Sequence, residues 1–401
     1  MNKKTQKKNR NPERKFYFLI KSNGLSGLSD LLADSGYSIK NELLKRGNWE
    51  EFNIKSPQIK NPDFIYTQGK QLYDRSLFKY HPKIKNNIEG LKNFSNKYNF
   101  SEELKKINPN EKKKYILNHY YINLYDYKND DDISSIKTIN YFKSIFNKNK
   151  VLICKALYSG KGEDVFVFDN FDDFYSFFKK YYYNSKSFME KHSFEKYKQL
   201  PDFDKYYNIE VPKTEWVLQE YINNPLLIQN RKFHFRVTLI YFIKKNKKPI
   251  MYLYNNFIVL TAKSEYKQND YLNKDIHDSH YRDSIKGLSF KNDLPKENNK
   301  NRHTYVLNQV IKISKDISQY LLNNKNYYKC YDQIENCYQF FGLDLMVNDK
   351  YDVKLIELNH VPGFPWSNYA PDLFSNLISH IVDPILPPKN KINDENVFIQ
   401  L

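Results

Sequence analysis

The stretch YQFFGLDLMVNDKYDVKLIELN, residues 338–359, decides how the rest of the chain folds. Two apolar runs flank the polar residues 348–352, so the stretch predicts a β-hairpin closed by a loop of about five residues. Three polar side chains, Asp344, Glu357 and Asn359, stand inside the apolar runs, where buried strands normally carry hydrophobic residues. They are therefore the first candidates for a functional site.

The alternation of side chains along a strand indicates which of these residues share a face. Glu357 and Asn359 are two positions apart and leave the same face, roughly 6.6 Å apart along the strand. Strict alternation also puts Leu355 on the face of Glu357 and Ile356 on the opposite face. If Asp344 pairs with Glu357, two carboxylates and one amide oxygen meet in a small patch.

The chemistry of this patch indicates a metal site. Two carboxylates this close repel each other unless a cation lies between them. A small set of oxygen ligands suits Mg²⁺ that also holds phosphate oxygens. The alternative is a carboxylate pair on a solvated sheet face, but the residues around Asp344 and Glu357 are too apolar for that.

Two motifs in the hairpin, FGLDLMV (341–347) and LIELNHVPGF (355–364), resemble the C-terminal nucleotide and metal hairpin of the tubulin-tyrosine-ligase-like family. The resemblance extends from residue 16 to about residue 385. It implies that Asp344, Glu357 and Asn359 are magnesium ligands. It also implies an α/β (α+β) fold of the ATP-grasp type, in three lobes, with ATP between the central and C-terminal domains.

The composition favours a soluble protein with an acidic partner. The 401 residues carry a formal charge of +18, and 40% of them are hydrophobic, which is enough for a sizeable core. A basic chain suits nucleic acid, an anionic membrane or an acidic peptide as a partner. Because Lys is scattered throughout the sequence, the charge alone does not discriminate between these partners. No apolar run approaches the roughly 18 residues of a membrane helix, and the basic N-terminus lacks the apolar block of a signal peptide.

The cysteines predict a reducing compartment. Cys154, Cys330 and Cys337 form neither a CxxC pair nor an even set. We therefore expect buried free thiols, with no disulfide and no zinc site.

Composition and periodicity divide the chain into five segments. The prediction is a disordered basic tail over 1–15, a small N-terminal α/β domain over 16–75, a central ATP-grasp domain over 76–213, a C-terminal ATP-grasp domain with the metal hairpin over 214–388, and a C-terminal tail over 389–401. Predicted helices cover residues 29–52, 79–98, 102–127, 171–178, 304–328 and 373–382, with a loop at 129–132 and a long connection over 181–213.

A second candidate site follows the apolar strand VLICK, residues 151–155. Strand, short glycine loop and strand is the layout of a hairpin that covers phosphates, because glycines allow close backbone approach and Lys155 offers charge. The P-loop pattern GxxxxGK[ST] is absent. The resemblance implies that Lys155 contacts the nucleotide phosphates together with the loop residues Ser159, Gly160, Lys161 and Gly162.

A third candidate region spans residues 216–236. The segment WVLQEYI (216–222) resembles the family strand that binds the adenine rim, which implies nucleotide contacts by Gln219, Glu220, Tyr221 and Ile222. In RKFHFR (231–236), alternation puts Lys232, His234 and Arg236 on one face, and three basic side chains on one face need anions. The resemblance implies that Lys232 and His234 lie at the nucleotide, and that Lys232 and Arg236 act in catalysis.

The chain departs from the family pattern near these residues. His234 stands in place of an aspartate, and Leu260 in place of an arginine. Where the family carries a His-Leu-Thr-Asn motif, His277 matches the histidine but Ser279 and His280 replace the threonine and asparagine. These departures leave the acceptor and the amino acid open.

The implied activity is that of an ATP-dependent carboxylate–amine ligase with Mg²⁺, which forms an amide through an acyl phosphate. The expected substrates are a free amino acid (Tyr, Glu or Gly) and an acidic protein tail such as that of tubulin, used by a monomeric, cytoplasmic enzyme. Two alternatives stay open. One is a pseudoenzyme that binds ATP or an acidic tail without ligation; the other is a basic nucleic-acid-binding protein, which the charge alone supports.

Overall fold

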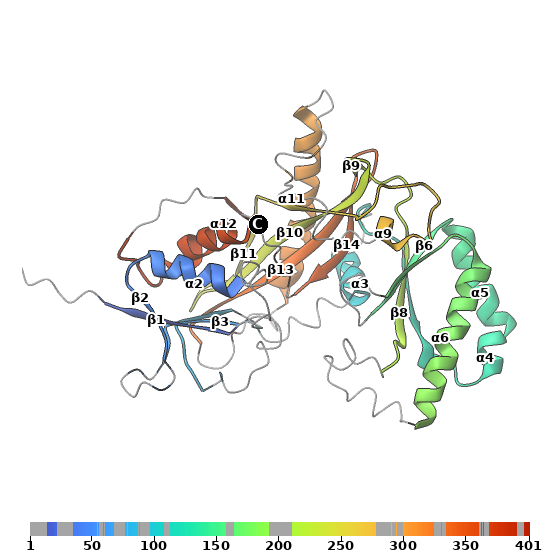
Figure 1. Cartoon of the computed structure of the whole chain (residues 1–401), viewed down its shortest axis with the longest axis horizontal. Coiled ribbons are helices and arrows are strands. Elements are labelled where there is room, and N and C mark those ends of the chain that lie inside the picture. Colours follow the sequence, from blue (N-terminus) through green and yellow to red (C-terminus); the bar gives the residue numbers. More distant parts are fainter. Residues whose placement is uncertain are drawn as a thin grey trace, which may run out of the picture.

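Figure 1 shows the chain as a computed structural model, which describes residues 14–21, 35–53, 55, 59, 61–67, 77, 79–86, 88, 97–107, 113–157, 164–191, 211–277, 290, 294, 300–324, 330, 334–360, 362, 364, 369–390 and 397–401. These residues form two β-sheets with helices packed against them. The predicted basic tail lies outside them except for residues 14 and 15.

Two long antiparallel strands, β10 (Arg231–Ile243) and β13 (Asn336–Val347), form the centre of the larger sheet. Every residue of both strands is buried except Arg231, which is half-buried, because the sheet is covered on both faces. Within the described residues the sheet order is β15-β11-β10-β13-β4-β3-β1-β2, with β12 and β9 paired to β10 and β14 paired to β13. The bounds are β1 (Phe16–Lys21), β2 (Trp49–Glu51), β3 (Phe64–Thr67), β4 (Ile84–Asn86), β9 (Leu227–Ile228), β11 (Ile250–Tyr254), β12 (Ile258–Thr261), β14 (Val353–Asn359) and β15 (Phe398–Gln400).

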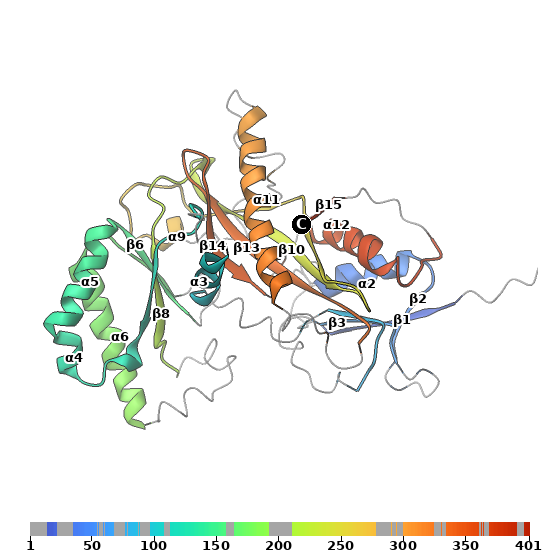
Figure 2. The same cartoon turned by 180° about the vertical axis from the view of Figure 1, so that it is seen from behind.

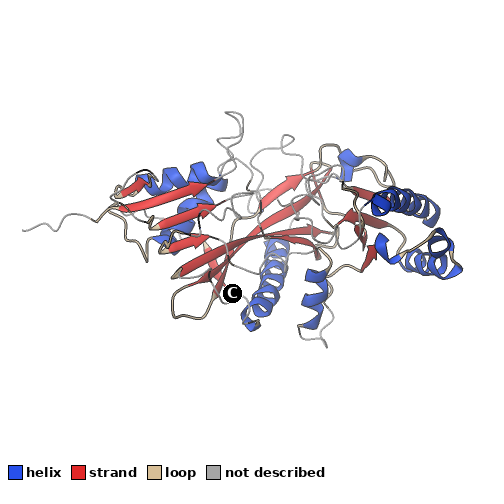
Figure 3. Ribbon diagram, turned by 90° about the horizontal axis from the view of Figure 1, so that it is seen from below, coloured by secondary structure: helices blue, strands red, loops and turns tan. Residues whose placement is uncertain are grey.

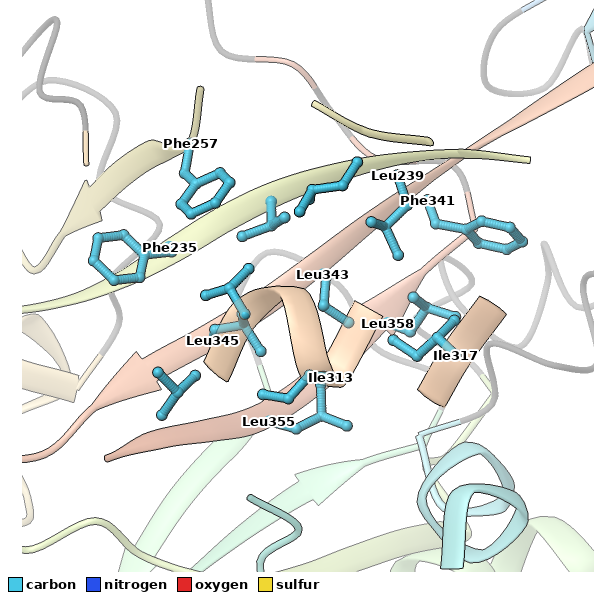
Figure 4. Packing of buried hydrophobic residues seen from close by; sticks show 14 of the residues in the cluster. Phe235, Leu239, Phe257, Ile313, Ile317, Phe341, Leu343, Leu345, Leu355 and Leu358 are labelled. Carbon is cyan, nitrogen blue, oxygen red and sulfur yellow. The ribbon is translucent and has the colours of Figure 1, made fainter. Parts of the chain in front are cut away.

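Helices cover both faces of this sheet (Figure 3). On one face lies α11 (Lys300–Asn323), whose apolar positions at helical spacing enter the core as predicted: Val306, Val310, Ile313, Ile317 and Leu321. Figure 4 shows Ile313 of α11 beside Leu343 and Leu355 of the sheet, and Ile317 beside Leu358. The other face packs against α2 (Ser35–Lys45), α12 (Tyr369–Leu377) and the π-helical turn η6 (Ile378–Val382).

The smaller sheet consists of β5 (His119–Asn123), β8 (Glu215–Glu220), β6 (Leu152–Ala156) and β7 (Val165–Phe168), all antiparallel in that order. Its outer face packs an aromatic core against α5 (Ile136–Lys148) and α6 (Phe171–Lys191), beside α4 (Asp130–Ser134). Figures 1 and 2 show these helices on the side of the smaller sheet that faces away from the larger one. Its inner face is therefore turned towards β13 and β14. The remaining elements are α3 (Asn99–Lys106), η4 (Leu124–Asp126) and α9 (Lys274–His277).

Several local predictions were wrong where long-range pairing decides the structure. Residues 84–86 and 119–123, predicted helical, are β4 and β5, because each finds a distant strand partner, β13 and β8 respectively. Trp49–Glu51 likewise pairs with β1 rather than continuing a helix. Residues 130–134 are helical, α6 runs on to Lys191, and β15 pairs with β11 where a tail was expected.

The expectation of free thiols was also wrong for one pair. Cys330 and Cys337 form a disulfide, with their Cα atoms 5.7 Å apart. Counting cysteines misses the bond because Cys154, buried in the smaller sheet, makes the total odd. Among the described residues, no helix combines the length and apolar character that crossing a membrane requires.

A fully buried arginine ties the N-terminal helix to the C-terminal one. Arg46, which follows α2, is 0% exposed, and its Nε donates to both carboxylate oxygens of Asp383 at 2.9 and 3.0 Å. Its terminal nitrogens donate to the Glu42 carbonyl at 2.7 Å and to Ser379 Oγ at 2.8 Å. Residues more than three hundred positions apart are thus held by one side chain.

Replacing Arg46 with methionine is expected to lower the free energy of unfolding by about 3–5 kcal/mol, because Glu42 and Asp383 would keep their charges without the partner. Urea unfolding followed by circular dichroism measures the loss. The control is Lys40→Met on the same helix, whose exposed pair with Glu51 should be worth less than about 1 kcal/mol. Equal effects of the two substitutions would contradict the assigned role of Arg46.

Candidate functional site

The metal hairpin has the predicted pairing with one irregularity. β13 and β14 are antiparallel, and Asp344 lies opposite Glu357 as expected. The register then shifts between Asp344 and Leu345, which pairs with Leu355, so Ile356 is an extra residue on β14. Such a β-bulge interrupts the strict alternation of side chains.

The bulge corrects the predicted faces of β14. Leu355, expected on the face of Glu357, instead lies in the main core with Leu343. Ile356, expected in that core, packs with Met346 of β13 and with Ile222. The extra residue therefore places an apolar side chain and the carboxylate of Glu357 next to each other, on the face turned to the smaller sheet.

Three neighbouring strands place a row of charged side chains across this face. Arg236 on β10 pairs with Asp344 on β13, which pairs with Glu357 on β14. Arg236 Nη2 donates to Asp344 Oδ2 at 3.0 Å, and its Nε donates to Oδ1 of the same carboxylate. Asn359 Nδ2 donates to Asp344 Oδ2 at 3.2 Å and to Glu357 Oε1 at 3.1 Å. The three predicted metal-ligating residues are thus brought together, with Arg236 beside them.

Gly342 makes room for this arrangement. A Cβ atom there would lie 2.6 Å from Cβ of Pro362 and 3.0 Å from Cδ of Arg236. Any side chain at position 342 would therefore collide both with the Pro362 ring and with the aliphatic part of Arg236. The glycine thus lets the arginine lie over β13 on its way to Asp344.

The donor set fits a magnesium ion that shares its coordination with a substrate. Asp344 and Glu357 supply carboxylate oxygens, and rotation of the Asn359 amide, which now donates to both of them, would present its Oδ1. No group of three or more His, Cys, Asp or Glu suited to a metal occurs in the described part of the chain. A few hard oxygen ligands without a complete protein cage are what Mg²⁺ with bound phosphates requires.

The basic face of β10 is buried next to this row. Lys232 and His234 are 4% and 3% exposed, and Nε2 of His234 lies 3.8 Å from Asp344 Oδ1. Leu260 is the partner of His234 in the pairing of β10 with β12, so the two departures from the family pattern are neighbours. Nζ of Lys232 lies over the ring of Tyr221, 4.1 Å from its centroid.

The smaller sheet contributes its own lysine from the opposite side. Lys155 on β6 donates to Gln219 Oε1 on β8 at 3.1 Å. Burial lowers the pKa of Lys155 to about 8, although the charge of Glu357 acts in the other direction. Burial, and then the charge of Lys155, lower the pKa of Lys232 to about 7. Both ammonium groups therefore lie in surroundings that disfavour their protonated, charged form unless an anion is bound beside them.

The last residues of β8 and the two that follow it carry the side chains predicted for the adenine rim. His277 Nε2 lies 2.8 Å from the carbonyl oxygen of Asp270 and must donate to it, so Nδ1 accepts from the Tyr221 hydroxyl at 2.9 Å. Glu220 accepts from Asn118 Nδ2 at 3.0 Å. Ile222 forms an apolar patch with Leu117, Met346 and Ile356. The glycine-loop residues Ser159, Gly160, Lys161 and Gly162, and also Ser279 and His280, lie outside the described residues.

Lys97 is a residue of this site that sequence reasoning did not find. It precedes α3, donates to the carbonyl oxygen of Ala156 at 3.1 Å, and is close enough to Glu357 for that carboxylate to raise its pKa against the lowering effect of burial. Its neighbourhood in the sequence is rich in Lys and Asn and has no motif. Only the folded chain brings it beside Lys155.

Comparisons with known proteins give the same fold. The structure is similar, with a TM-score of 0.59 and 17% identity over 96% of this chain and 98% of the other, to the C-terminal domain of K. lactis Pby1, described as an ATP-grasp enzyme interacting with the mRNA decapping enzyme Dcp2. At that identity the likeness shows the fold alone. The chain therefore has the ATP-grasp fold, as predicted.

Curated relatives match parts of the sequence. A probable tubulin–tyrosine ligase of Schizosaccharomyces pombe is 25% identical over 189 residues, 44% of this chain and 45% of that protein. The probable tubulin–tyrosine ligase PBY1 of Saccharomyces cerevisiae is 26% identical over 45% of this chain and 26% of its own length. Tubulin glycylase 3C of Tetrahymena thermophila is 26% identical over 40% of this chain and 16% of its own length. The matched region spans less than half the length of each of these relatives.

The match to a family model is more extensive. The model of the tubulin-tyrosine ligase family covers residues 80–394, which is well over half of the chain and includes both sheets except β1–β3 and β15. This chain belongs to the tubulin-tyrosine ligase family.

Proposed function

We propose that the protein is an ATP-dependent carboxylate–amine ligase whose nucleotide lies between the two sheets. The observation that carries the proposal is the charge of the buried face. Four cationic side chains, Lys97, Lys155, Lys232 and Arg236, converge there with the carboxylates Asp344 and Glu357. A buried excess of positive charge with a magnesium-type donor set calls for a polyphosphate.

In this proposal, different residues contact different parts of the nucleotide. Gln219, Glu220, Tyr221 and Ile222 would meet the adenine rim, and the apolar patch around Met346 and Ile356 would cover one face of the base. Lys155 and Lys232 would bind phosphate oxygens, with His234 and the glycine loop nearby. Asp344, Glu357 and Asn359 would hold Mg²⁺, which supplies charge stabilisation to the phosphates during transfer.

The proposed reaction needs no nucleophilic side chain. A substrate carboxylate attacks the γ-phosphorus of ATP, ADP leaves, and an amine then attacks the acyl phosphate to give an amide and inorganic phosphate. Arg236, held by Asp344 on one edge of its guanidinium, would stabilise the negative oxygens in these steps. Its bidentate pair fixes its direction, so little reorganisation is needed when the charge develops.

The proposed substrates are a free amino acid (Tyr, Glu or Gly) and an acidic protein tail such as that of tubulin. The names of the relatives and the formal charge of +18 support this choice. Tubulin is cytoplasmic, and we propose that a monomer acts in that compartment. The second candidate is an ATP-binding pseudoenzyme, which the adjacent departures His234 and Leu260 favour.

The test of ligation is ADP release from ATP and Mg²⁺ with a panel of free amino acids and acidic tail peptides, with mass spectrometry of the peptides. A ligase gives a peptide a discrete mass gain. Glu357→Gln should reduce the rate by about 10²–10³-fold, because the cation site loses a charge next to the phosphates. Glu335→Gln, which alters an exposed pair with Lys245, is the matched control and should leave the rate unchanged.

Binding of ATP without ADP release or mass gain under any of these conditions would support the pseudoenzyme instead. If Glu357→Gln and Glu335→Gln had the same rate as the unaltered protein, the hairpin would not be the metal site.

The depressed lysine pKa values predict how ATP affinity depends on pH. With its pKa near 7 in the free protein, Lys232 is largely neutral at about pH 8, and phosphate oxygens favour its protonated form. ATP binding above about pH 7.5 should therefore take up a proton, and affinity should fall by up to about tenfold per pH unit. Titration calorimetry in buffers of different ionisation enthalpy measures this uptake.

The uptake should shrink in Lys232→Met and persist in Lys245→Met, an exposed lysine paired with Glu335. Lys155, with a pKa of about 8, would add to it at higher pH. An affinity independent of pH between about 7.5 and 9 would contradict the proposed contact of Lys232 with the phosphates.

A further inference from the structure

The disulfide Cys330–Cys337 lies apart from the residues assigned to the nucleotide site. It joins the segment before β13 to the second residue of that strand. Its two ends differ in exposure: Cys337 is fully buried, whereas Cys330 is partly exposed and packs against the main core. Cys330 is therefore the more accessible of the two cysteines to a thiol from solution.

Cys337 stands where the N-terminal strands join the rest of the larger sheet. β4 pairs with β13 through Asn336↔Ile84, Cys337↔Lys85 and Tyr338↔Asn86, and the cysteine holds the middle position. On the other edge of β13, Cys337 pairs with Ile243, the last residue of β10. The disulfide thus ties the middle residue of the short segment that pairs with β4 to the chain before β13. We call this pairing of residues 84–86 with residues 336–338 the β4–β13 seam.

We propose that Cys330 and Cys337 undergo reversible thiol–disulfide exchange with a glutathione-type thiol, and that the oxidised form stiffens the β4–β13 seam. The small thiolate attacks Sγ of Cys330, the S–S bond breaks, and the electron pair passes to Sγ of Cys337, which takes up a proton. A second thiolate then displaces Cys330 from the mixed disulfide. The products are two protein thiols and one oxidised glutathione, and the reverse sequence restores the bond.

The chemistry of the surroundings supports a reversible bond. Glutathione keeps cytoplasmic thiols reduced, so disulfides in that compartment are usually transient or redox-sensing; this step rests on the location proposed above. The third cysteine, Cys154, is fully buried, and burial raises the pKa of its thiol well above the usual range. Cys154 should therefore stay an unreactive thiol in the folded protein and serve as an internal reference.

Non-covalent contacts at the seam limit the effect of reduction. Asn336 Nδ2 donates to the carbonyl oxygen of Lys83 at 2.9 Å, and its Oδ1 accepts from the backbone nitrogen of Lys245 at 3.1 Å. These bonds persist without the disulfide, so reduction loosens the seam and does not unfold the sheet. Asp344 and Glu357 lie towards the other end of β13, and this inference therefore stands or fails independently of the ligase activity.

The first measurement counts thiols. The full chain is equilibrated with oxidised or reduced glutathione, denatured, alkylated with iodoacetamide and weighed by mass spectrometry. Of the 3 cysteines, the oxidised sample should carry a single label, on Cys154, and the reduced sample should carry a label on each. Labelling of all cysteines in the oxidised sample would overturn the proposal.

The second measurement is hydrogen exchange of the same two samples. Amides of residues 84–86 and 336–338 should exchange on the order of tenfold faster after reduction, with residues 353–359 unchanged. Cys330→Ser should behave like the reduced protein in both conditions, whereas Cys154→Ser should keep the response. Equal exchange at the seam in both redox states would reject its stiffening by the disulfide.

Discussion

The antiparallel pairing of β10 with β13 is the constraint on which the rest of the structure depends. It runs without interruption from Phe235↔Leu345 to Ile243↔Cys337 through the middle of the larger sheet. A slip of one residue would turn every apolar side chain of one strand to the opposite face. The register that buries Phe235 and Leu345 also sets Arg236 opposite Asp344, so the same pairing forms both the core and the candidate site.

The lysine charges at the site lower the stability of the folded chain. Lys155, which is partly buried, and Lys232, which is buried, lie on opposing sheets, and the charge of each is disfavoured by desolvation and by a neighbouring ammonium group. A chain selected for stability alone would place apolar side chains there. Preorganised cations in a low-dielectric gap interact strongly with a polyanion, which is how a binding site uses such an arrangement.

Local patterns predicted those parts of the molecule whose geometry is set locally. The hairpin of residues 338–359, the pairing of Asp344 with Glu357 and the apolar stripe of α11 follow from periods of two and of about 3.6 residues along a single segment. Ile356 was misplaced because a bulge depends on how two strands fit together, and no residue pattern in β14 indicates it. Lys97 and the strands β4 and β5 depend on partners far away in the sequence. The disulfide joins cysteines only 7 residues apart, and it is missed for another reason: the free Cys154 makes the cysteine count odd.

In the described part of the chain, the backbone segments that enter and leave the smaller sheet each contact the β13–β14 hairpin. Before β5, the nitrogen of Leu355 donates to the carbonyl oxygen of Tyr115 at 2.8 Å, beside the bridge Ile116↔Leu355. After β8, Pro225 bridges Asn348, and Leu226 donates to Val347 at 2.8 Å. Two points of attachment define an axis, and a sheet attached at two points swings about that axis more easily than it shifts in other directions. A rotation about that axis would change the gap between Lys155 and Glu357, so for the proposed enzyme nucleotide entry and closure over the phosphates would be opposite phases of one rotation.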